Sequence, residues 1–248
     1  MTTEKRNTAQ HAHGLRLGGI TPWSSVDYPG HMAATIFCGG CPWRCRYCHN
    51  HHLQPPTGGL SWATVRDFLK RREGLLEAVV VSGGEPLAQA GALRPVLREV
   101  RAMGLKTALH TASVTPRRLE HLLPDIDWVG FDVKAPFEDY AAITGRARSG
   151  QAARAALQML LASGKDHEIR TTVHPQLLPE TRLIVLVQDL ASMGVTGLVL
   201  QPFRPQGCPD ADLARGYTPW LHADLHQTLR LLMPTLRIRD LVPYARVG

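Results

Sequence analysis

Three cysteines are spaced closely enough to bind one metal group. Cys41, Cys45 and Cys48 form a C-x3-C-x2-C pattern. Thiolates are the ligands that hold iron–sulfur clusters, and three of them leave one iron of a [4Fe–4S] cubane open to a substrate. The alternative is a structural zinc site whose fourth ligand comes from the histidines that follow, His49, His51 or His52. Structural zinc sites usually bring two ligand pairs from separate segments, so this single cluster of cysteines favours iron and sulfur.

A second segment suits a small ligand. Residues 82–86 read Ser-Gly-Gly-Glu-Pro. Gly83 and Gly84 let the main chain approach a ligand closely. Glu85 offers an acceptor for an ammonium group, and Pro86 is a favoured first residue of a helix. Alone this segment indicates only a turn, but after a loop that contains C-x3-C-x2-C it indicates a binding site.

Six strand-then-helix units position these segments. The strands are short and apolar throughout, as in a parallel sheet covered on both faces. We predict an α/β fold, an open, partial (β/α)6 TIM-like barrel, with a doubly wound sheet as the alternative. The predicted strands are residues 33–37, 78–81, 105–110, 128–132, 168–173 and 198–200, and the predicted helices are residues 62–73, 86–103, 116–123, 151–163, 180–193 and 219–233.

The unusual polar residues follow the strands of this predicted sheet. The cysteines follow the first strand, and Glu85 follows the second. Asp132 and Lys134 follow the fourth strand, and Arg170 lies in the fifth. Chemistry in parallel sheets is found at the carboxyl ends of the strands. We therefore expect all of these residues at one rim of the barrel.

Composition sets the class of protein. The chain has 248 residues, 44% of them hydrophobic, and a formal net charge of +7. Its apolar runs are too short to span a bilayer, and residues 1–13 lack the apolar stretch of a secretory signal. We predict a cytoplasmic protein with a flexible N-terminus at 1–13 and one domain at 14–248. The basic residues are scattered and do not form the block of a nucleic-acid-binding protein, although a positive field favours an acidic protein partner. Cys38 and Cys208 lie outside the triplet and are interpreted as ordinary small residues.

These motifs together resemble the radical S-adenosylmethionine (SAM) superfamily, in particular its glycyl-radical-enzyme activases. Within the activases the resemblance is closest to the anaerobic ribonucleoside-triphosphate reductase activating proteins. It spans roughly residues 15–205, in the expected order. The matching segments are Ser25-Val-Asp27-Tyr-Pro29-Gly30, the cysteine loop through Asn50, residues 82–86, Phe131-Asp132-Val-Lys134, Arg170-Thr-Thr-Val173 and Gln201-Pro202-Phe203.

The resemblance implies the radical SAM fold and a specific activity. S-adenosyl-L-methionine would be cleaved reductively at a [4Fe–4S] cluster to a 5′-deoxyadenosyl radical, which abstracts hydrogen from a glycine of a partner enzyme. Two partners are implied. One is a glycyl radical enzyme, namely an anaerobic ribonucleotide reductase, and the other is an electron donor such as flavodoxin. Neither a membrane nor a nucleic acid is an expected partner. No catalytic side chain is implied, because the cofactor carries the radical.

The resemblance also implies roles for single residues. The cysteine triplet would hold three irons, and Tyr47 would pack against the adenine. Gly83, Gly84 and Glu85 would receive the methionine ammonium group. Asp132, Lys134 and Arg170 would surround the ribose and the carboxylate, where a cation suits a carboxylate. Asp27 would face the target glycine. Simpler structural roles remain open: packing for Tyr47, an ion pair for Asp132 with Lys134, a helix cap for Arg170 and a turn for Asp27.

Three positions depart from the family pattern. Gly39 replaces a polar residue that relatives often carry, which predicts a looser cluster loop. His110 stands where formate-lyase activases have Asp, and Arg204 stands where they have a ribose-contacting His. An alternative function is a radical SAM enzyme that acts on a purine-like metabolite, as 7-carboxy-7-deazaguanine synthases do. A third is a zinc or iron–sulfur protein without enzymatic activity.

Overall fold

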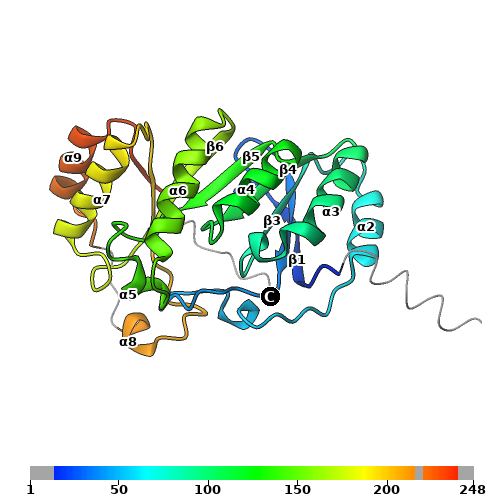
Figure 1. The fold of residues 1–248 in the computed structure, drawn as a ribbon, viewed down its shortest axis with the longest axis horizontal. Helices are drawn as coiled ribbons and strands as arrows, with labels where there is room; N and C mark the ends of the chain where they lie inside the picture. Colours follow the sequence, from blue (N-terminus) through cyan, green and yellow to red (C-terminus); the bar gives the residue numbers. More distant parts are fainter. Residues whose placement is uncertain (1–13, 216–219, 240–248) are drawn as a thin grey trace, which may run out of the picture.

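The computed structural model describes residues 14–215 and 220–239. Its centre is an eight-stranded sheet whose strands follow one another in chain order (Figure 1). β1 is antiparallel to β2, and every later pair of neighbours is parallel. β1 and β8 are the two edges, so the described sheet is open. The strands are β1 (Leu17–Ser24), β2 (Ala33–Cys38), β3 (Ala78–Gly83), β4 (Lys106–Thr111), β5 (Trp128–Asp132), β6 (Asp166–Val173), β7 (Val199–Pro202) and β8 (Arg237–Ile238).

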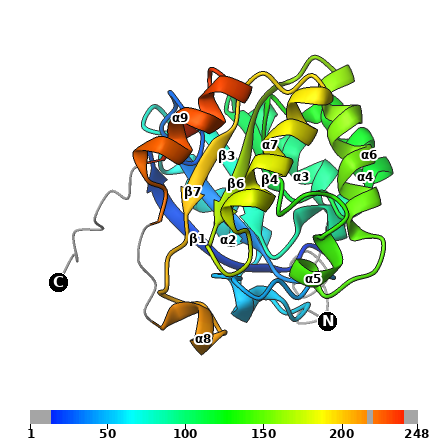
Figure 2. The ribbon, with the colours of Figure 1, turned by 90° about the vertical axis from the view of Figure 1, so that its left-hand side faces the viewer.

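Helices connect the parallel strands and cover the outer face of the sheet (Figure 2). Local sequence sets where they begin: the Ser61 hydroxyl accepts a hydrogen bond from the Thr64 N–H at 3.1 Å and caps the first of them. The α-helices are α2 (Trp62–Lys70), α3 (Ala90–Ala102), α4 (Pro116–Leu122), α5 (Tyr140–Thr144), α6 (Ser149–Ala162), α7 (Glu180–Ser192), α8 (Ala211–Ala214) and α9 (Ala223–Leu232). The 3-10 turns are η1 (His51–Leu53), η2 (Pro86–Gln89) and η3 (Leu123–Asp125).

The two faces of the sheet carry different residues. Ile36, Val81 and Phe131 belong to the main core under the helices and are fully buried. A smaller cluster lies on the inner face, where Tyr28 stacks on Trp128 with ring centroids 5.3 Å apart. Trp128 is the first residue of β5. The loop between β1 and β2 therefore fills the inner face at the end where the parallel strands begin, which leaves the opposite end for the chemistry.

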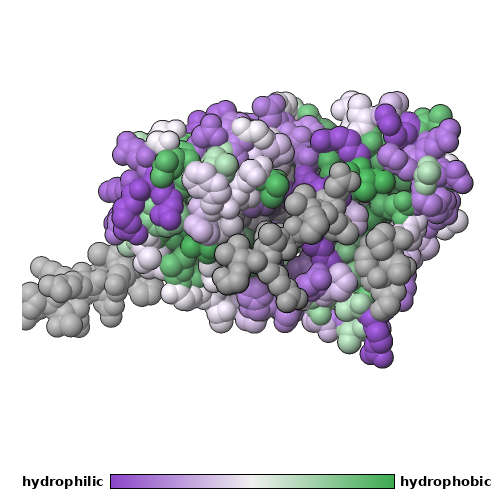
Figure 3. Space-filling model, turned by 180° about the vertical axis from the view of Figure 1, so that it is seen from behind, coloured by the Kyte–Doolittle hydropathy of each residue, from purple (hydrophilic) through white to green (hydrophobic). Residues whose placement is uncertain are grey.

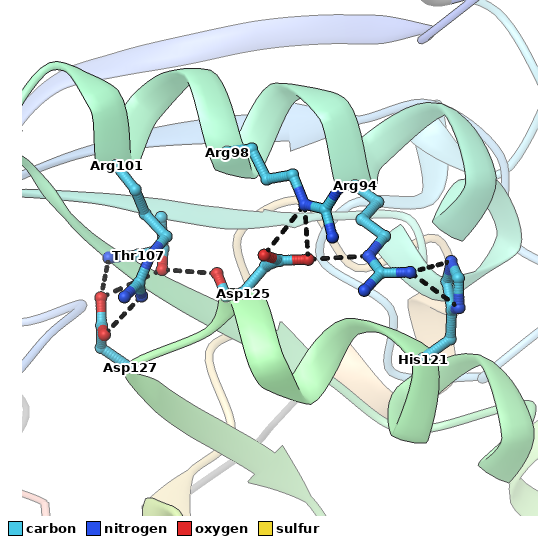
Figure 4. Close-up of polar contacts among 7 residues, drawn as sticks. All are labelled: Arg94, Arg98, Arg101, Thr107, His121, Asp125 and Asp127. Atoms are coloured by element: carbon cyan, nitrogen blue, oxygen red, sulfur yellow. Dashed lines mark hydrogen bonds and ion pairs between the residues drawn. The ribbon is translucent and has the colours of Figure 1, made fainter.

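Ion pairs on the outer side fix α3 against the segment before β5 (Figure 4). The Asp125 carboxylate accepts from Arg94 Nε at 2.7 Å and from Arg98 Nε at 3.1 Å. Arg101 and Asp127 form a second pair at 2.6 Å. Burial alone would raise the pKa of Asp125, but the two arginines outweigh it and lower that pKa. These arginines hold the scaffold together, and the two aspartates offset part of their charge.

Most of the predicted elements are present, and the mostly parallel, open sheet confirms the fold class. The prediction missed β1, β8 and the short helices α5 and α8. β1 contains two glycines and a proline, Leu-Gly-Gly-Ile-Thr-Pro-Trp-Ser, so it lacks the apolar run that marks the other strands. The predicted helix 86–103 is divided into η2 and α3, and the last helix begins at Ala223 rather than at 219. Residue 219 and the N-terminal segment 1–13 lie outside the described residues.

The described surface is mixed in character. In the view from behind, hydrophilic and apolar residues are interspersed, and apolar patches lie toward both ends of the molecule (Figure 3). Among the described residues, none of the helices has both the length and the apolar character needed to cross a bilayer.

Candidate functional site

The loop that carries the cysteines is firmly anchored at its start. The Gly39 N–H donates to Arg16 O at 2.9 Å, and the Gly39 carbonyl accepts from Gln89 Nε2 at 3.0 Å. A Cβ at Gly39 would lie 1.7 Å from the Thr57 carbonyl oxygen, so only glycine fits. The Cys41 N–H donates to Gln54 O at 3.0 Å. The looser loop that we expected from Gly39 is therefore not found, because the missing side chain makes room for main-chain packing.

The three cysteines of the triplet share this loop and are partly buried. The Cys48 N–H donates to Cys45 O at 3.1 Å, which folds the second half of the loop into a turn. Burial raises the pKa of the Cys41 thiol to about 12 and raises that of Cys45 above its ordinary value. Metal binding at these thiols would release their protons, because thiolates are the ligands. Cys38, by contrast, is fully buried in the core under the helices.

The histidines after the triplet contact a neighbouring loop. His49 Nε2 lies 2.5 Å from the Arg204 carbonyl oxygen, and His51 Nδ1 lies 3.0 Å from that of Gly207. Within residues 14–215 and 220–239, no three His, Cys, Asp or Glu side chains converge in a way that would hold a single metal ion. Cys208 lies in the same neighbouring loop, with its Sγ 3.5 Å from Arg46 O.

The glycine pair packs directly onto the cysteine loop. The Gly84 N–H donates to Cys38 O at 2.8 Å, and the Glu85 N–H donates to Gly40 O at 2.9 Å. Gly83 has φ +118°, a conformation that side chains disfavour, and its Cβ would lie 2.3 Å from Cys38 N. A Cβ at Gly84 would lie 2.6 Å from Gly40 O. The two motifs, about forty residues apart, thus form one continuous main-chain surface.

The Glu85 side chain points inward and is 1% exposed. Its carboxylate accepts from Thr111 Oγ1 at 2.7 Å, from Leu87 N at 3.0 Å and from Ala112 N at 3.1 Å. Burial raises the pKa of Glu85, and these hydrogen bonds oppose that rise. Glu85 therefore joins the start of η2 to the end of β4.

A group of charges lies at the end of β5. Arg170 Nε donates to Asp132 Oδ1 at 2.9 Å, and Lys134 Nζ lies 3.7 Å from Asp132 Oδ2. Burial alone would raise the pKa of Asp132, but the charges of Arg170 and Lys134 outweigh it and lower that pKa. Lys134 Nζ is 5.6 Å from the centre of the Tyr47 ring. The Tyr47 hydroxyl is buried and has no hydrogen-bond partner among the described residues.

A second polar chain runs along the inner face below this group. His110 Nε2 lies 2.7 Å from Asp27 O and 3.2 Å from Arg170 Nη1. A carbonyl can only accept, so the shorter contact assigns the proton to His110 Nε2. Thr35 Oγ1 donates to the Asp27 carboxylate at 2.7 Å. A Cβ at Gly130 would lie 2.8 Å from the Arg170 guanidinium, so this glycine makes the room in which Arg170 lies.

The state of His110 predicts a pH dependence of stability. Burial, followed by the charge of Arg170, lowers the pKa of His110 to about 4. Between pH 6.5 and about 4 the unfolded chain binds a proton that the folded chain does not, so stability falls as the pH falls, by up to about 1.4 kcal/mol per pH unit. Above pH 6.5 this group contributes no slope. Urea unfolding from pH 7 to pH 4.5 should show a flatter slope for His110→Gln than for the wild type; equal slopes would contradict the neutral, buried imidazole.

Comparison with models of protein families shows to which superfamily the chain belongs. The model of the radical SAM superfamily matches residues 35–185. The chain belongs to the radical SAM superfamily. Membership implies a [4Fe–4S] cluster and S-adenosylmethionine as cofactors, and the matched segment includes the cysteine loop, the glycine pair and the charges at the end of β5.

Two proteins with names that describe a function are similar to this chain in sequence. One relative is MJ1227 of Methanocaldococcus jannaschii, whose name describes it as a glycyl-radical enzyme activating enzyme. It is 27% identical to this chain over 80% of this chain and 84% of its own length. The pyruvate formate-lyase-activating enzyme of Clostridium pasteurianum is 33% identical over 54% of this chain and 59% of that enzyme. The chain thus spans less than two thirds of the Clostridium enzyme.

A solved structure shows the same fold. SuiB of Streptococcus suis, bound to its precursor peptide SuiA, superposes with a TM-score of 0.61 and 13% identity. The superposition covers 96% of this chain and 52% of SuiB. At this identity the likeness concerns the fold, an open and mostly parallel barrel.

Three features of the site fit the cofactors of the superfamily. Three thiols lie in one anchored loop, which is the donor set that a cluster needs. The absence of side chains at Gly83 and Gly84 lets this segment pack main chain to main chain against Cys38 and Gly40, directly before the cysteines. The buried Tyr47 hydroxyl has no partner in the part of the chain that the structure describes, and such groups are normally satisfied.

The cysteine loop, the glycine pair and the group around Asp132 meet at the carboxyl ends of β2 to β5. The sequence predicted that these segments lie together at one rim. It missed Thr35, Thr111 and Gly130. A threonine or a glycine inside a strand pattern carries little signal alone; only the strand register, which pairs Gly130 with His110, shows their position.

Proposed function

We propose that this chain is a glycyl-radical-enzyme activating enzyme whose partner is an anaerobic ribonucleoside-triphosphate reductase. The observation that carries the enzyme class is the main-chain pairing of the cysteine loop with Gly84 and Glu85, beside the charges around Asp132. The choice of the reductase as partner rests on the resemblance of the sequence motifs to its activating proteins. The names of two relatives, one of them a pyruvate formate-lyase-activating enzyme, support the activase class. Residues 14–248 would act as a single domain.

In this proposal Cys41, Cys45 and Cys48 hold three irons of the cluster and leave the fourth iron to the methionine part of S-adenosylmethionine. When bound, the two cofactors supply the radical chemistry, so the protein needs no acid or base of its own. The chain contributes position and the exclusion of water. The partly buried loop and the anchoring at Gly39 support this role.

The residues around the cluster loop would bind S-adenosylmethionine. The Glu85 carboxylate is buried and already accepts three hydrogen bonds, so the methionine ammonium would be received by main-chain carbonyls of Gly83, Gly84 and Glu85. Gly83 and Gly84 let the main chain approach that group. Lys134 and Arg170 supply positive charge for the methionine carboxylate, and Asp132 supplies acceptors for the ribose.

Two further residues complete the proposed site. Tyr47 would pack against the adenine. Its buried position, and a hydroxyl without a partner among the described residues, support this role. Asp27 would face the target glycine. Its carboxylate is held by Thr35 and its carbonyl by His110, so it is fixed on the inner face of the barrel.

The test is activation of a candidate partner. We would incubate the anaerobically reconstituted chain with reductant and S-adenosylmethionine, and add either an anaerobic ribonucleotide reductase or a pyruvate formate-lyase. We expect a glycine-centred doublet in the electron paramagnetic resonance spectrum with the reductase only. A doublet with pyruvate formate-lyase alone would overturn the choice of partner. Formation of 5′-deoxyadenosine without a doublet in either mixture would instead favour a small-molecule substrate.

A further inference from the structure

A basic surface lies on the outside of the cysteine loop. One cavity of about 410 Å³ is lined by Pro42 and Trp43 of that loop, by Arg118 of α4, and by Arg146 and Arg148 before α6. A neighbouring cavity of about 540 Å³ shares Arg118 and Ala88 with the first one. Its basic residues are Arg16, Arg117, Arg118 and His121. The helices α4 and α6 lie side by side here (Figures 1 and 2).

The positive charge of this surface is not neutralised by its own lining. The described residues that line the two cavities include five arginines and one histidine but no Asp or Glu. Arg117 and Arg148 are exposed, and no ion pair to either is present among the described residues. This differs from Arg94 and Arg98 nearby, which share Asp125 (Figure 4). The N-terminus of the long helix α6 adds to the same positive field.

The basic surface is joined directly to the cluster loop. Arg146 Nε donates to the Pro42 carbonyl oxygen at 2.8 Å, and Arg44 Nη1 donates to Cys41 O at 2.6 Å. These guanidinium groups bind neutral carbonyls, so they keep their full charge beside Cys41. A protein docked here would lie against the main chain that holds the cysteines.

The same surface does not belong to the inner face of the barrel. The inner face carries Asp27, Thr35, His110 and Arg170, and none of these residues lines either cavity. A partner on the outer surface therefore leaves the inner face open for S-adenosylmethionine and the target glycine. An electron can pass from the outer surface to the cluster through the loop, whereas hydrogen abstraction requires direct contact with the target glycine on the inner face.

We propose that this basic surface docks an acidic one-electron carrier protein, which reduces the cluster. The carrier loses one electron and the cluster gains it, and no bond forms or breaks in this step. The inference rests on the proposed function in one respect: that function requires electrons from a source outside this protein. A positive patch of this kind steers an acidic partner to the right face and raises the association rate, more than it adds to raw affinity. The net charge of +7 acts in the same direction.

The experiment compares two reductants on the reconstituted enzyme. One is reduced flavodoxin, an acidic carrier protein, and the other is photoreduced deazaflavin, a small molecule that needs no docking. The variant is Arg117→Glu/Arg148→Glu, and the readout is the rate of 5′-deoxyadenosine formation, which requires no glycyl radical partner. With flavodoxin we expect kcat/KM for the carrier to fall at least about tenfold at low salt. Its dependence on salt should also weaken, because fewer exposed charges remain to be screened. With deazaflavin we expect the wild-type rate.

The controls separate docking from other effects. Lys70→Glu reverses an exposed charge on α2, outside both cavities, and should leave both rates unchanged. An unchanged rate with flavodoxin in the double variant would overturn the proposal, because the carrier then docks elsewhere. An equal fall with both reductants would also overturn it, since the surface then acts on the cluster loop itself. Normal reduction with loss of the glycyl radical would assign the surface to the glycyl enzyme. If the wild type forms no 5′-deoxyadenosine with deazaflavin, the proposed function fails instead.

Discussion

Replacement of Cys48 by alanine is expected to abolish 5′-deoxyadenosine formation and to remove the visible absorption of the cluster. A cubane held by two thiolates lacks one of its three protein ligands, and His49 and His51 are engaged by carbonyls of the neighbouring loop. The same result is expected for Cys41→Ala and Cys45→Ala. The measurement is the iron and sulfide content after anaerobic reconstitution, together with the product formed per enzyme.

Cys38→Ala is the matched control, because it removes a thiol only three residues before the triplet. Cys38 is fully buried in the core under the helices. We expect this variant to keep its iron and its activity, with a loss of about 1 kcal/mol in the free energy of unfolding from the small cavity. If Cys38→Ala loses the cluster while Cys48→Ala keeps it, the ligand set is wrong.

Replacement of Arg170 by methionine is expected to destabilise the fold strongly. The Arg170 side chain is 7% exposed and donates to Asp132 at 2.9 Å. Its loss leaves a carboxylate whose remaining cation, Lys134, is 3.7 Å away. Removing one partner of a buried pair costs about 3–5 kcal/mol, and because Asp132 is 31% exposed we expect the lower end, about 3 kcal/mol. The pKa of Asp132 should rise toward its ordinary value, since the larger of its two opposing charges is gone.

Urea unfolding of the reconstituted protein, without S-adenosylmethionine, measures this change. Arg182→Met is a suitable control, because Arg182 pairs with Glu138 and Asp139 at the surface and such pairs contribute little. Arg170→Lys should not restore stability, because an ammonium cannot reproduce the planar contacts that Arg170 makes beside Gly130. A loss for Arg182→Met as large as that for Arg170→Met would mean that burial is not the cause.

Much of the fold could be predicted because its strands are uniform. Residues 78–81 and 128–132 are apolar runs between clear stop signals, so the alternation of strands and helices is visible in the sequence. β1 was missed because its role depends on pairing with β2 rather than on its own composition. The same limit applies to the contacts of Asp27. The sequence predicts this residue near the target glycine, but its neighbours His110 and Thr35 come from different strands and could not be predicted.

The site was predictable to the level of motifs but not of contacts. C-x3-C-x2-C and Gly-Gly-Glu-Pro each have a chemical meaning at fixed spacing, and the topology of a parallel sheet then brings them to one edge. What Gly39 does could not be predicted, because its role is to admit the carbonyl of Thr57, a contact visible only in three dimensions. The interpretation of Gly39 as a loosening substitution was therefore wrong.

We infer that the cysteine triplet holds a cluster whose open iron binds S-adenosylmethionine. The most direct measurement is the electron paramagnetic resonance spectrum of the reduced, reconstituted protein before and after this nucleotide is added. We predict an iron–sulfur signal that changes shape when the nucleotide binds, in the wild type and in Cys38→Ala. A protein that holds zinc, or an iron–sulfur signal that the nucleotide leaves unchanged, would contradict the account.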